Sequence, residues 1–66
     1  MNIQLNGENT PVDDGATLTD VINNLSLQGS RYAVEVNEEL VPRSEHDRYH
    51  LKEGDSVEIV QAIGGG

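Results

Sequence analysis

The sequence predicts an α+β domain, in which one mixed sheet of four to five strands carries a single helix across one face. Three observations lead to this fold class. The 66 residues suffice for one small hydrophobic core. Apolar and polar residues alternate near both ends and in the centre of the chain, as is typical of strands. The apolar spacing of an amphipathic helix occurs in one segment between them.

The first strand is predicted over residues 1–5, where apolar and polar side chains alternate. Asn6-Gly7 then favours a tight hairpin turn, because both residues tolerate positive φ. The returning strand runs through residues 10–12. Pro11 has no N–H to donate to a neighbouring strand, so we expect this strand at an edge of the sheet.

The helix is predicted from residue 18 to about residue 27. Thr17 stands three residues before Asp20, which is the spacing of a capping box at a helix start. Gly29 is expected to end the helix. The apolar residues at a helical period are Leu18, Val21, Ile22 and Leu25.

The second half of the chain contains the remaining strands. A third strand is predicted at 32–36, a turn at 37–39 and a brief fourth strand at 40–41. Residues 43–51 are polar and irregular, with one helical turn from Ser44. Tyr49 and Leu51 are expected to anchor this segment.

The last strand is predicted at 57–62, in the centre of the sheet beside the first strand. A hairpin, a crossover helix and further strands in this order are typical of the ubiquitin-like β-grasp fold, an assignment made by analogy.

The charge of the chain argues against two classes of partner. Twelve acidic residues against four basic ones give a net charge of -8, which disfavours nucleic acid and anionic membranes. Solubility explains this charge, and steering toward a basic groove on a partner protein is the functional alternative. No apolar run is long enough for a signal peptide or a membrane span, so we expect a cytoplasmic protein.

No catalytic or metal-binding constellation is found in the sequence. The absence of cysteine excludes disulfides, a cysteine metal site and thiol catalysis. His46 and His50 could share a metal on a helix, but no third ligand is indicated, and we expect a solvated loop without metal. Glu38 and Glu39 are adjacent in a turn, without a pocket to shift a pKa. We therefore expect no enzymatic activity.

The C-terminal Gly64-Gly65-Gly66 is not explained by local structure. A frayed end is one interpretation. The alternative is a thin, flexible tail (residues 64–66) on a domain of residues 1–63. Fully extended, three residues reach at most ~10–11 Å, which would let Gly64 and Gly65 thread a narrow channel and present the Gly66 carboxylate to a partner.

Five segments together carry a resemblance to a known family. They are residues 1–7, residues 33–37, Val41-Pro42-Arg43, residues 54–60 and Gly65-Gly66. Through them the whole chain resembles the ThiS-type sulfur carrier proteins of thiamine biosynthesis, small relatives of ubiquitin and of the molybdopterin-synthase small subunit. Many relatives carry a Trp where this chain has His46 and Tyr49, so no role for that aromatic is carried over.

The resemblance implies a function for Gly66. A ThiF-type adenylating enzyme would use ATP and Mg²⁺ to form an acyl-adenylate on Gly66. A cysteine-persulfide relay would then supply sulfur, and the resulting thiocarboxylate would pass it to thiazole synthase. The chain itself would bind no cofactor.

Three other functions stay open. A molybdopterin-type carrier would use the same chemistry, although those relatives are usually longer and often carry a Pro where this chain has Gln61-Ala62-Ile63. A ubiquitin-like modifier would end in an amide bond to lysine. A β-grasp interaction module would have an inert tail.

A partner interface is predicted on the last strand, whose side chains alternate between faces. Val57 and Ile59 are expected to face the helix, so the residues between and after them face away. The expected interface has Val60, Ala62 and Ile63 at its apolar centre and Glu35 and Glu58 at its rim.

Overall fold

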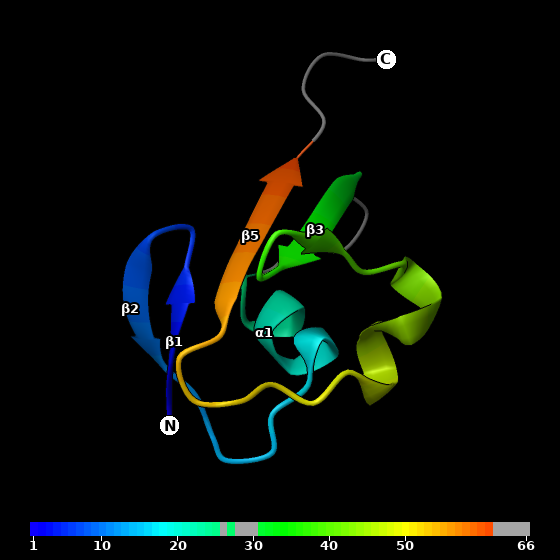
Figure 1. Cartoon of the computed structure of the whole chain (residues 1–66). Helices are drawn as coiled ribbons and strands as arrows, with labels where there is room; N and C mark the ends of the chain where they lie inside the picture. The colour runs from blue at the N-terminus through cyan, green and yellow to red at the C-terminus, as the bar shows by residue number, and fades with distance from the viewer. Residues whose placement is uncertain (26, 28–30, 62–66) are drawn as a thin grey trace.

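The computed structural model describes residues 1–25, 27 and 31–61. It contains a five-stranded mixed sheet in the order β2-β1-β5-β3-β4, with α1 across one face (Figure 1). The elements are β1 (Asn2–Leu5), β2 (Glu8–Pro11), α1 (Leu18–Asn24), β3 (Tyr32–Val36), β4 (Glu39–Leu40), the 3₁₀ helix η1 (Arg43–Arg48) and β5 (Ser56–Gln61). The predicted fold class is confirmed.

The β1–β2 hairpin forms one side of the sheet. Its turn is Asn6-Gly7, with φ of 51° and 86°, which are left-handed values that Asn and Gly accept at low cost. β2 is an edge strand, as Pro11 predicts. β1 runs antiparallel to β2 and parallel to β5, which therefore occupies the predicted central position.

A capping box starts α1, as predicted. The Asp20 N–H donates to the Thr17 hydroxyl at 3.3 Å, and the Thr17 N–H donates to the Asp20 carboxylate at 3.0 Å. The helix ends at Asn24, however, earlier than the predicted residue 27. Leu25 closes it with a 3₁₀-type bond to the Ile22 carbonyl and is 39% exposed.

The early helix end has a local cause. Two consecutive asparagines precede Leu25, and their side chains compete with the helical backbone for hydrogen bonds. Gly29, the predicted stop, lies outside the described residues. Neither α1 nor any other helix in the described ranges is long and apolar enough to cross a membrane.

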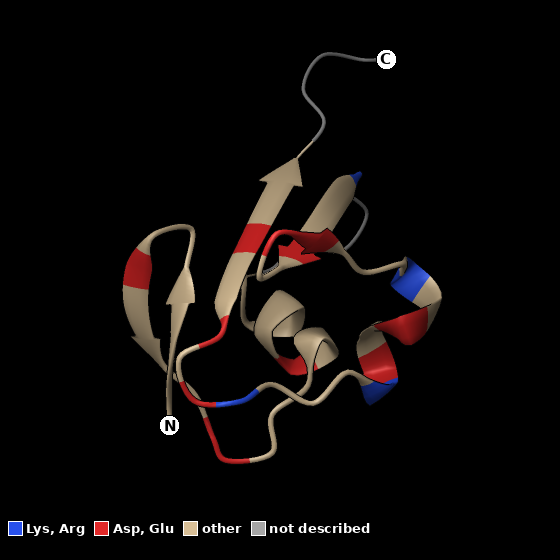
Figure 2. Ribbon diagram, viewed as in Figure 1, with Lys and Arg blue, Asp and Glu red and all other residues tan. Residues whose placement is uncertain are grey.

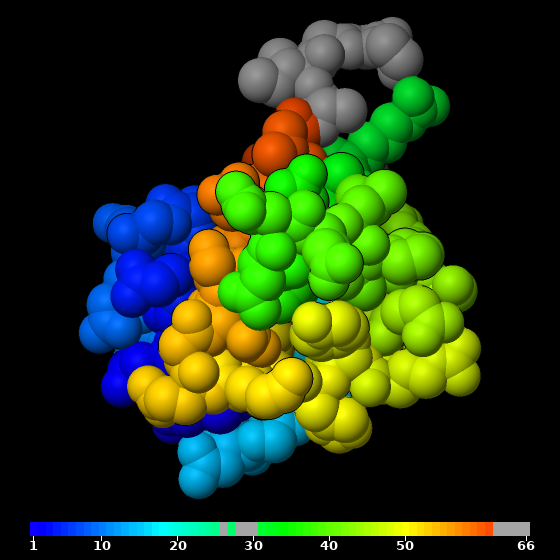
Figure 3. Space-filling view, viewed as in Figure 1, coloured from blue at the N-terminus to red at the C-terminus, as the bar shows by residue number. Residues whose placement is uncertain are grey.

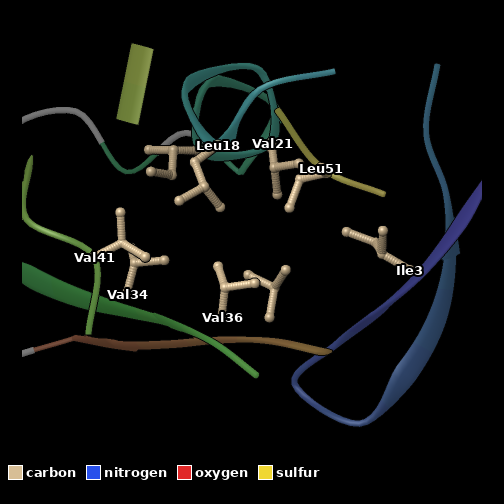
Figure 4. Packing of buried hydrophobic residues seen from close by; sticks show 9 residues of the cluster. Ile3, Leu18, Val21, Val34, Val36, Val41 and Leu51 are labelled. Atoms are coloured by element: carbon tan, nitrogen blue, oxygen red, sulfur yellow. The ribbon is translucent and has the colours of Figure 1, made fainter. Parts of the chain in front are cut away.

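Among the described residues, the buried cluster between α1 and the sheet consists of aliphatic side chains, as expected for a chain without Phe and Trp. Figure 4 shows its side chains meeting between the helix and the strands. Tyr49 packs against this core from the segment after η1, so that segment is anchored as predicted. The buried cluster comprises Ile3, Leu18, Val21, Ile22, Val34, Val36, Val41, Leu51 and Val57.

Asp55 fixes the start of β5 against the β3–β4 turn. It is 8% exposed, and its carboxylate accepts hydrogen bonds from the Asn37 side-chain amide at 3.1 Å and the Lys52 N–H at 2.8 Å. The Asn37 side-chain oxygen in turn accepts from the Ser56 N–H at 3.0 Å. The beginning of the central strand is therefore held by side chains as well as by the sheet.

Replacing Asp55 by Ala should lower the free energy of unfolding by about 1–3 kcal/mol, because it leaves two part-buried hydrogen-bond donors without an acceptor. Denaturant unfolding measures this loss. Asp13→Ala is the matched control: Asp13 is exposed, and no described residue hydrogen-bonds its side chain. Its effect should stay within about 0.5 kcal/mol. Equal losses in both variants would contradict the role of Asp55.

Candidate functional site

β5 brings the chain to the predicted tail from the centre of the sheet. Its first half lies between β1 and β3, because Ser56 pairs with Gln4 and Val57 with Leu5 on the β1 side. From Glu58 onward β5 pairs with β3 only, and its end projects beyond the β1–β2 hairpin (Figure 1). Gln61 is the last described residue. The last described residue therefore belongs to the central strand of the sheet.

The predicted residues beyond Gln61 cannot be placed. Gly66, the proposed site of modification, lies outside the described residues, as do Gly64 and Gly65. The same holds for Ala62 and Ile63 of the predicted interface. Val60, Glu58 and Glu35 are described.

The side chains of β5 alternate between faces as predicted. Val57 is fully buried against α1, and Ile59 is half-buried and packs on the same core. Glu58 is exposed, and Val60 is 65% exposed on the opposite face of the sheet. The strand register inferred from the sequence is therefore confirmed over the described residues.

The face of the sheet opposite α1 carries exposed apolar side chains near the end of β5. Val60 pairs with Ala33, which is also exposed. Leu40 of β4, 68% exposed, pairs with Glu35 and so lies on this same face. Figure 3 shows β5 in orange between the blue hairpin and the green β3–β4 region, which α1 does not cover in this view.

Leu40 extends the predicted interface to the far edge of the sheet. Leu40 and Val41 are neighbours in the predicted fourth strand, so their side chains must face opposite sides of the sheet. Val41 is buried, so the alternation places Leu40 in solvent. Period-two alternation was the signal that could have identified Leu40.

Glu35 and Glu58 are brought directly opposite each other across β3 and β5. Like charges in this position destabilise a sheet. Among the described residues, no cationic group forms an ion pair with either carboxylate. The two predicted rim residues therefore form one acidic spot beside the exposed apolar side chains.

A shallow hollow of about 310 Å³ lies where β3 and β5 meet at the end from which the C-terminal residues depart. In this hollow, Tyr32 and Ala33 of β3 lie beside the exposed Val60 of β5. Its lining residues are Arg31, Tyr32, Ala33, Val60 and Gln61.

A stack of three side chains connects η1 to this end of β3. The Arg43 guanidinium carbon lies 4.5 Å from the centroid of the Tyr32 ring. The Tyr32 and His46 rings stack, with centroids 6.3 Å apart and planes at 22°. No local sequence pattern indicates this contact, because it joins a strand to an irregular segment eleven or more residues away.

The expectation of a solvated His46 is wrong. His46 is 5% exposed, and its Nε2 lies 3.0 Å from the Val41 carbonyl oxygen. Because a carbonyl only accepts, Nε2 carries the proton. Packing against β3 and this bond together explain the burial of a residue whose sequence neighbours are polar.

The two histidines do not converge on one point. The His50 Nδ1 is directed to the Gly15 carbonyl oxygen at 3.1 Å, whereas His46 bonds to Val41. η1 is a 3₁₀ helix that ends before His50, so residues four apart do not share a face as in an α-helix. Within the part of the chain that the structure describes, no group of three side chains could hold a metal.

Comparison with known proteins gives a consistent result. A model of the ThiS family matches residues 3–66. The crystal structure of the thiamine biosynthesis protein ThiS from Geobacter metallireducens superposes with a TM-score of 0.82 and 32% identity, covering 100% of both chains. The fold and the length of the two proteins therefore agree throughout.

Curated relatives match over the whole of this chain as well. Thiazole synthases of Paramagnetospirillum magneticum and Magnetococcus marinus are 35% and 38% identical to it, and the chain spans 20% of the length of each. The uncharacterized protein ycf40 of Porphyra purpurea is 32% identical, over 93% of its length. From the family match and the whole-chain structural match together, the chain belongs to the ThiS family.

Proposed function

We propose that this chain donates sulfur for thiamine biosynthesis as a thiocarboxylate on Gly66. The family match, which extends through Gly66, carries the proposal. The structural neighbour named as a thiamine biosynthesis protein supports the choice of pathway over molybdopterin synthesis. The central position of β5, which ends five residues before Gly66, supports a terminus presented from a rigid base.

The chemistry requires a partner enzyme, because a carboxylate is a poor electrophile. One oxygen of the Gly66 carboxylate attacks the α-phosphate of ATP, and pyrophosphate leaves. Sulfur from a cysteine persulfide then attacks the carbonyl carbon and displaces AMP. After a thiol cleaves the sulfur–sulfur bond, Gly66 ends in a thiocarboxylate. ATP and Mg²⁺ belong to the ThiF-type partner, and we expect the reaction to take place in the cytoplasm.

The carrier itself contributes a terminus and a docking surface. It has no cysteine, so its sulfur travels on the C-terminal carbonyl. The exposed Val60 and Leu40, with the acidic pair between them, are suited to a partner surface that combines apolar and basic side chains. Ala62 and Ile63 remain predicted members of this interface. Gly64 and Gly65 would pass through the narrow entrance to the nucleotide.

A thiazole synthase is the proposed recipient of the sulfur. Two proteins of that name contain a segment similar to this entire chain within a longer polypeptide. Joining the two in one chain keeps the sulfur donor beside its acceptor, which raises their effective concentration. We infer that the present chain meets its thiazole synthase through a comparable contact.

Isotope exchange between pyrophosphate and ATP tests the adenylation step. With the cognate ThiF-type enzyme, ATP and Mg²⁺, exchange should depend on the addition of this chain. The partner enzyme without carrier is the control. No exchange with a folded carrier and an enzyme that is active on another carrier would contradict the proposal.

Gly65→Val should lower the rate of this exchange by about a hundredfold, because a β-branched side chain would displace the carboxylate from the α-phosphate. Gly65→Ala should give an intermediate rate. Because Gly65 lies beyond the end of β5, the melting temperature should be that of the wild type. A normal exchange rate for the valine variant would show that the entrance is not narrow.

A further inference from the structure

The surroundings of Arg43 are not explained by the docking surface proposed around Val60 and Leu40. The chain has four Lys and Arg residues against twelve Asp and Glu, and acidic residues occur on most elements (Figure 2). Arg43 is exposed at the start of η1. No carboxylate of the described residues forms an ion pair with it. In so acidic a chain, an unpaired guanidinium is unexpected.

Carboxylates are nevertheless present on η1 itself and on the preceding β4. Glu39 and Glu45 line a shallow hollow between β4 and η1. Glu45 pairs instead with Arg48, at 3.1 Å. Arg43 lies over the neutral Tyr32 ring, 4.5 Å from its centroid. Its guanidinium is therefore held by a ring and not neutralised by an acid.

This contact preorganises the guanidinium. Tyr32 is half-buried and stacks on His46, which is fixed by its bond to the Val41 carbonyl. A guanidinium over a ring uses its face for the contact and keeps the N–H groups at its edge for a planar acceptor. Because the side chain is already ordered, less conformational entropy is lost when an oxyanion binds.

Arg43 contacts Tyr32, which pairs with the last described residue of β5. Tyr32 pairs with Gln61, so the stack lies at the end of the sheet where β5 leads into the C-terminal residues. A partner that holds Gly66 must approach this end. Residues 62–66 can span at most about 18 Å, so a partner that holds Gly66 lies within that distance of Gln61, which pairs with Tyr32.

We propose that Arg43 is a specificity-determining residue that binds an Asp or Glu carboxylate of the adenylating partner. This inference rests on the proposed function. A phosphate of the bound ATP is the alternative oxyanion, but that nucleotide reacts at Gly66, at the far end of residues 62–66. One contact of reversed sign on a carrier with a net charge of -8 fixes the orientation in which the partner can dock.

The test is the affinity of the wild-type carrier and two variants for the cognate ThiF-type enzyme, measured by calorimetry without nucleotide and with ATP. Arg43→Met keeps an apolar chain over Tyr32 and removes the charge. Arg48→Met is the matched control, because it removes the same charge from the same helix, where Arg48 pairs with Glu45. Melting temperatures of all three proteins are measured in parallel.

Arg43→Met should weaken binding by about tenfold or more, equally with and without ATP. Arg48→Met should bind as the wild type does. Arg43→Lys, which keeps the charge but lacks the planar fork, should recover part of the affinity. The melting temperature of Arg43→Met should remain close to that of the wild type.

Three results would overturn the inference. Equal affinities of Arg43→Met and wild type would show that Arg43 only covers Tyr32. Equal losses in Arg43→Met and Arg48→Met would show a general effect of charge. A loss seen with ATP alone would assign the contact to phosphate. In each of these cases, the proposed function still holds if the wild-type carrier supports pyrophosphate exchange. If the wild-type carrier neither binds the enzyme nor supports exchange, both the Arg43 inference and the proposed function are wrong.

Discussion

Adding one residue after Gly66 is expected to abolish adenylation. The added residue converts the Gly66 carboxylate into an amide, which has no oxygen nucleophile for the α-phosphate of ATP. The new terminal carboxylate lies one residue further along, about 3.3–3.6 Å beyond the reacting position when the chain is extended. Pyrophosphate exchange with the cognate ThiF-type enzyme should fall to the level measured without carrier.

The extended protein provides its own structural control. The sheet and the core lie upstream of residue 62, so its melting temperature should equal that of the wild type. Intact-mass analysis before the assay shows that the added residue is still present. Full exchange by an untrimmed extended protein would show that Gly66 is not the reacting residue.

Val57→Asp is expected to unfold the domain. Val57 is 0% exposed and sits on the central strand under α1, so the substitution buries a carboxylate without a partner. Burying an unpaired carboxylate in this core lowers the free energy of unfolding by several kcal/mol. This loss is about as large as the whole free energy of unfolding of a domain of this size. Circular dichroism should show loss of the cooperative thermal transition.

Val60→Asp is the matched variant on the same strand. Val60 is 65% exposed on the opposite face, so the same substitution should change the melting temperature little. It should instead weaken binding to the adenylating enzyme and to thiazole synthase, because a charge at the centre of an interface is costly to desolvate. Ile59→Asp, at a half-buried position, should destabilise the fold less than Val57→Asp.

Binding and unfolding distinguish the two faces of β5. Unfolding of the Val60 variant with a stable Val57 variant would mean that the strand register is shifted by one residue. Normal partner affinity of a folded Val60→Asp protein would show that the open face is not the docking surface.

The sheet was predictable because its determinants are local. Alternation fixed which face of each strand is buried, and Asn6-Gly7 and Pro11 have backbone properties that define a turn and an edge strand. The helix start was equally clear from Thr17 and Asp20. Its end was not, since the apolar stripe continues to Leu25 while the two asparagines before it terminate the helix.

The segment around η1 was the least predictable part. Its residues are polar in sequence, yet His46 is buried because Tyr32, fourteen positions earlier, lies against it. Such a contact depends on how η1 packs on β3, which no local pattern encodes. The Arg43 contact with the same ring follows from that packing and was missed for the same reason.

The most direct test of sulfur transfer is the intact mass of the carrier after incubation with the ThiF-type enzyme, ATP, Mg²⁺ and a cysteine-persulfide donor. We expect a mass increase equal to replacement of one oxygen by sulfur, located on Gly66 by fragmentation. The increase should disappear when ATP is omitted. An unchanged mass, or an amide bond between Gly66 and a lysine of another protein, would contradict a sulfur carrier.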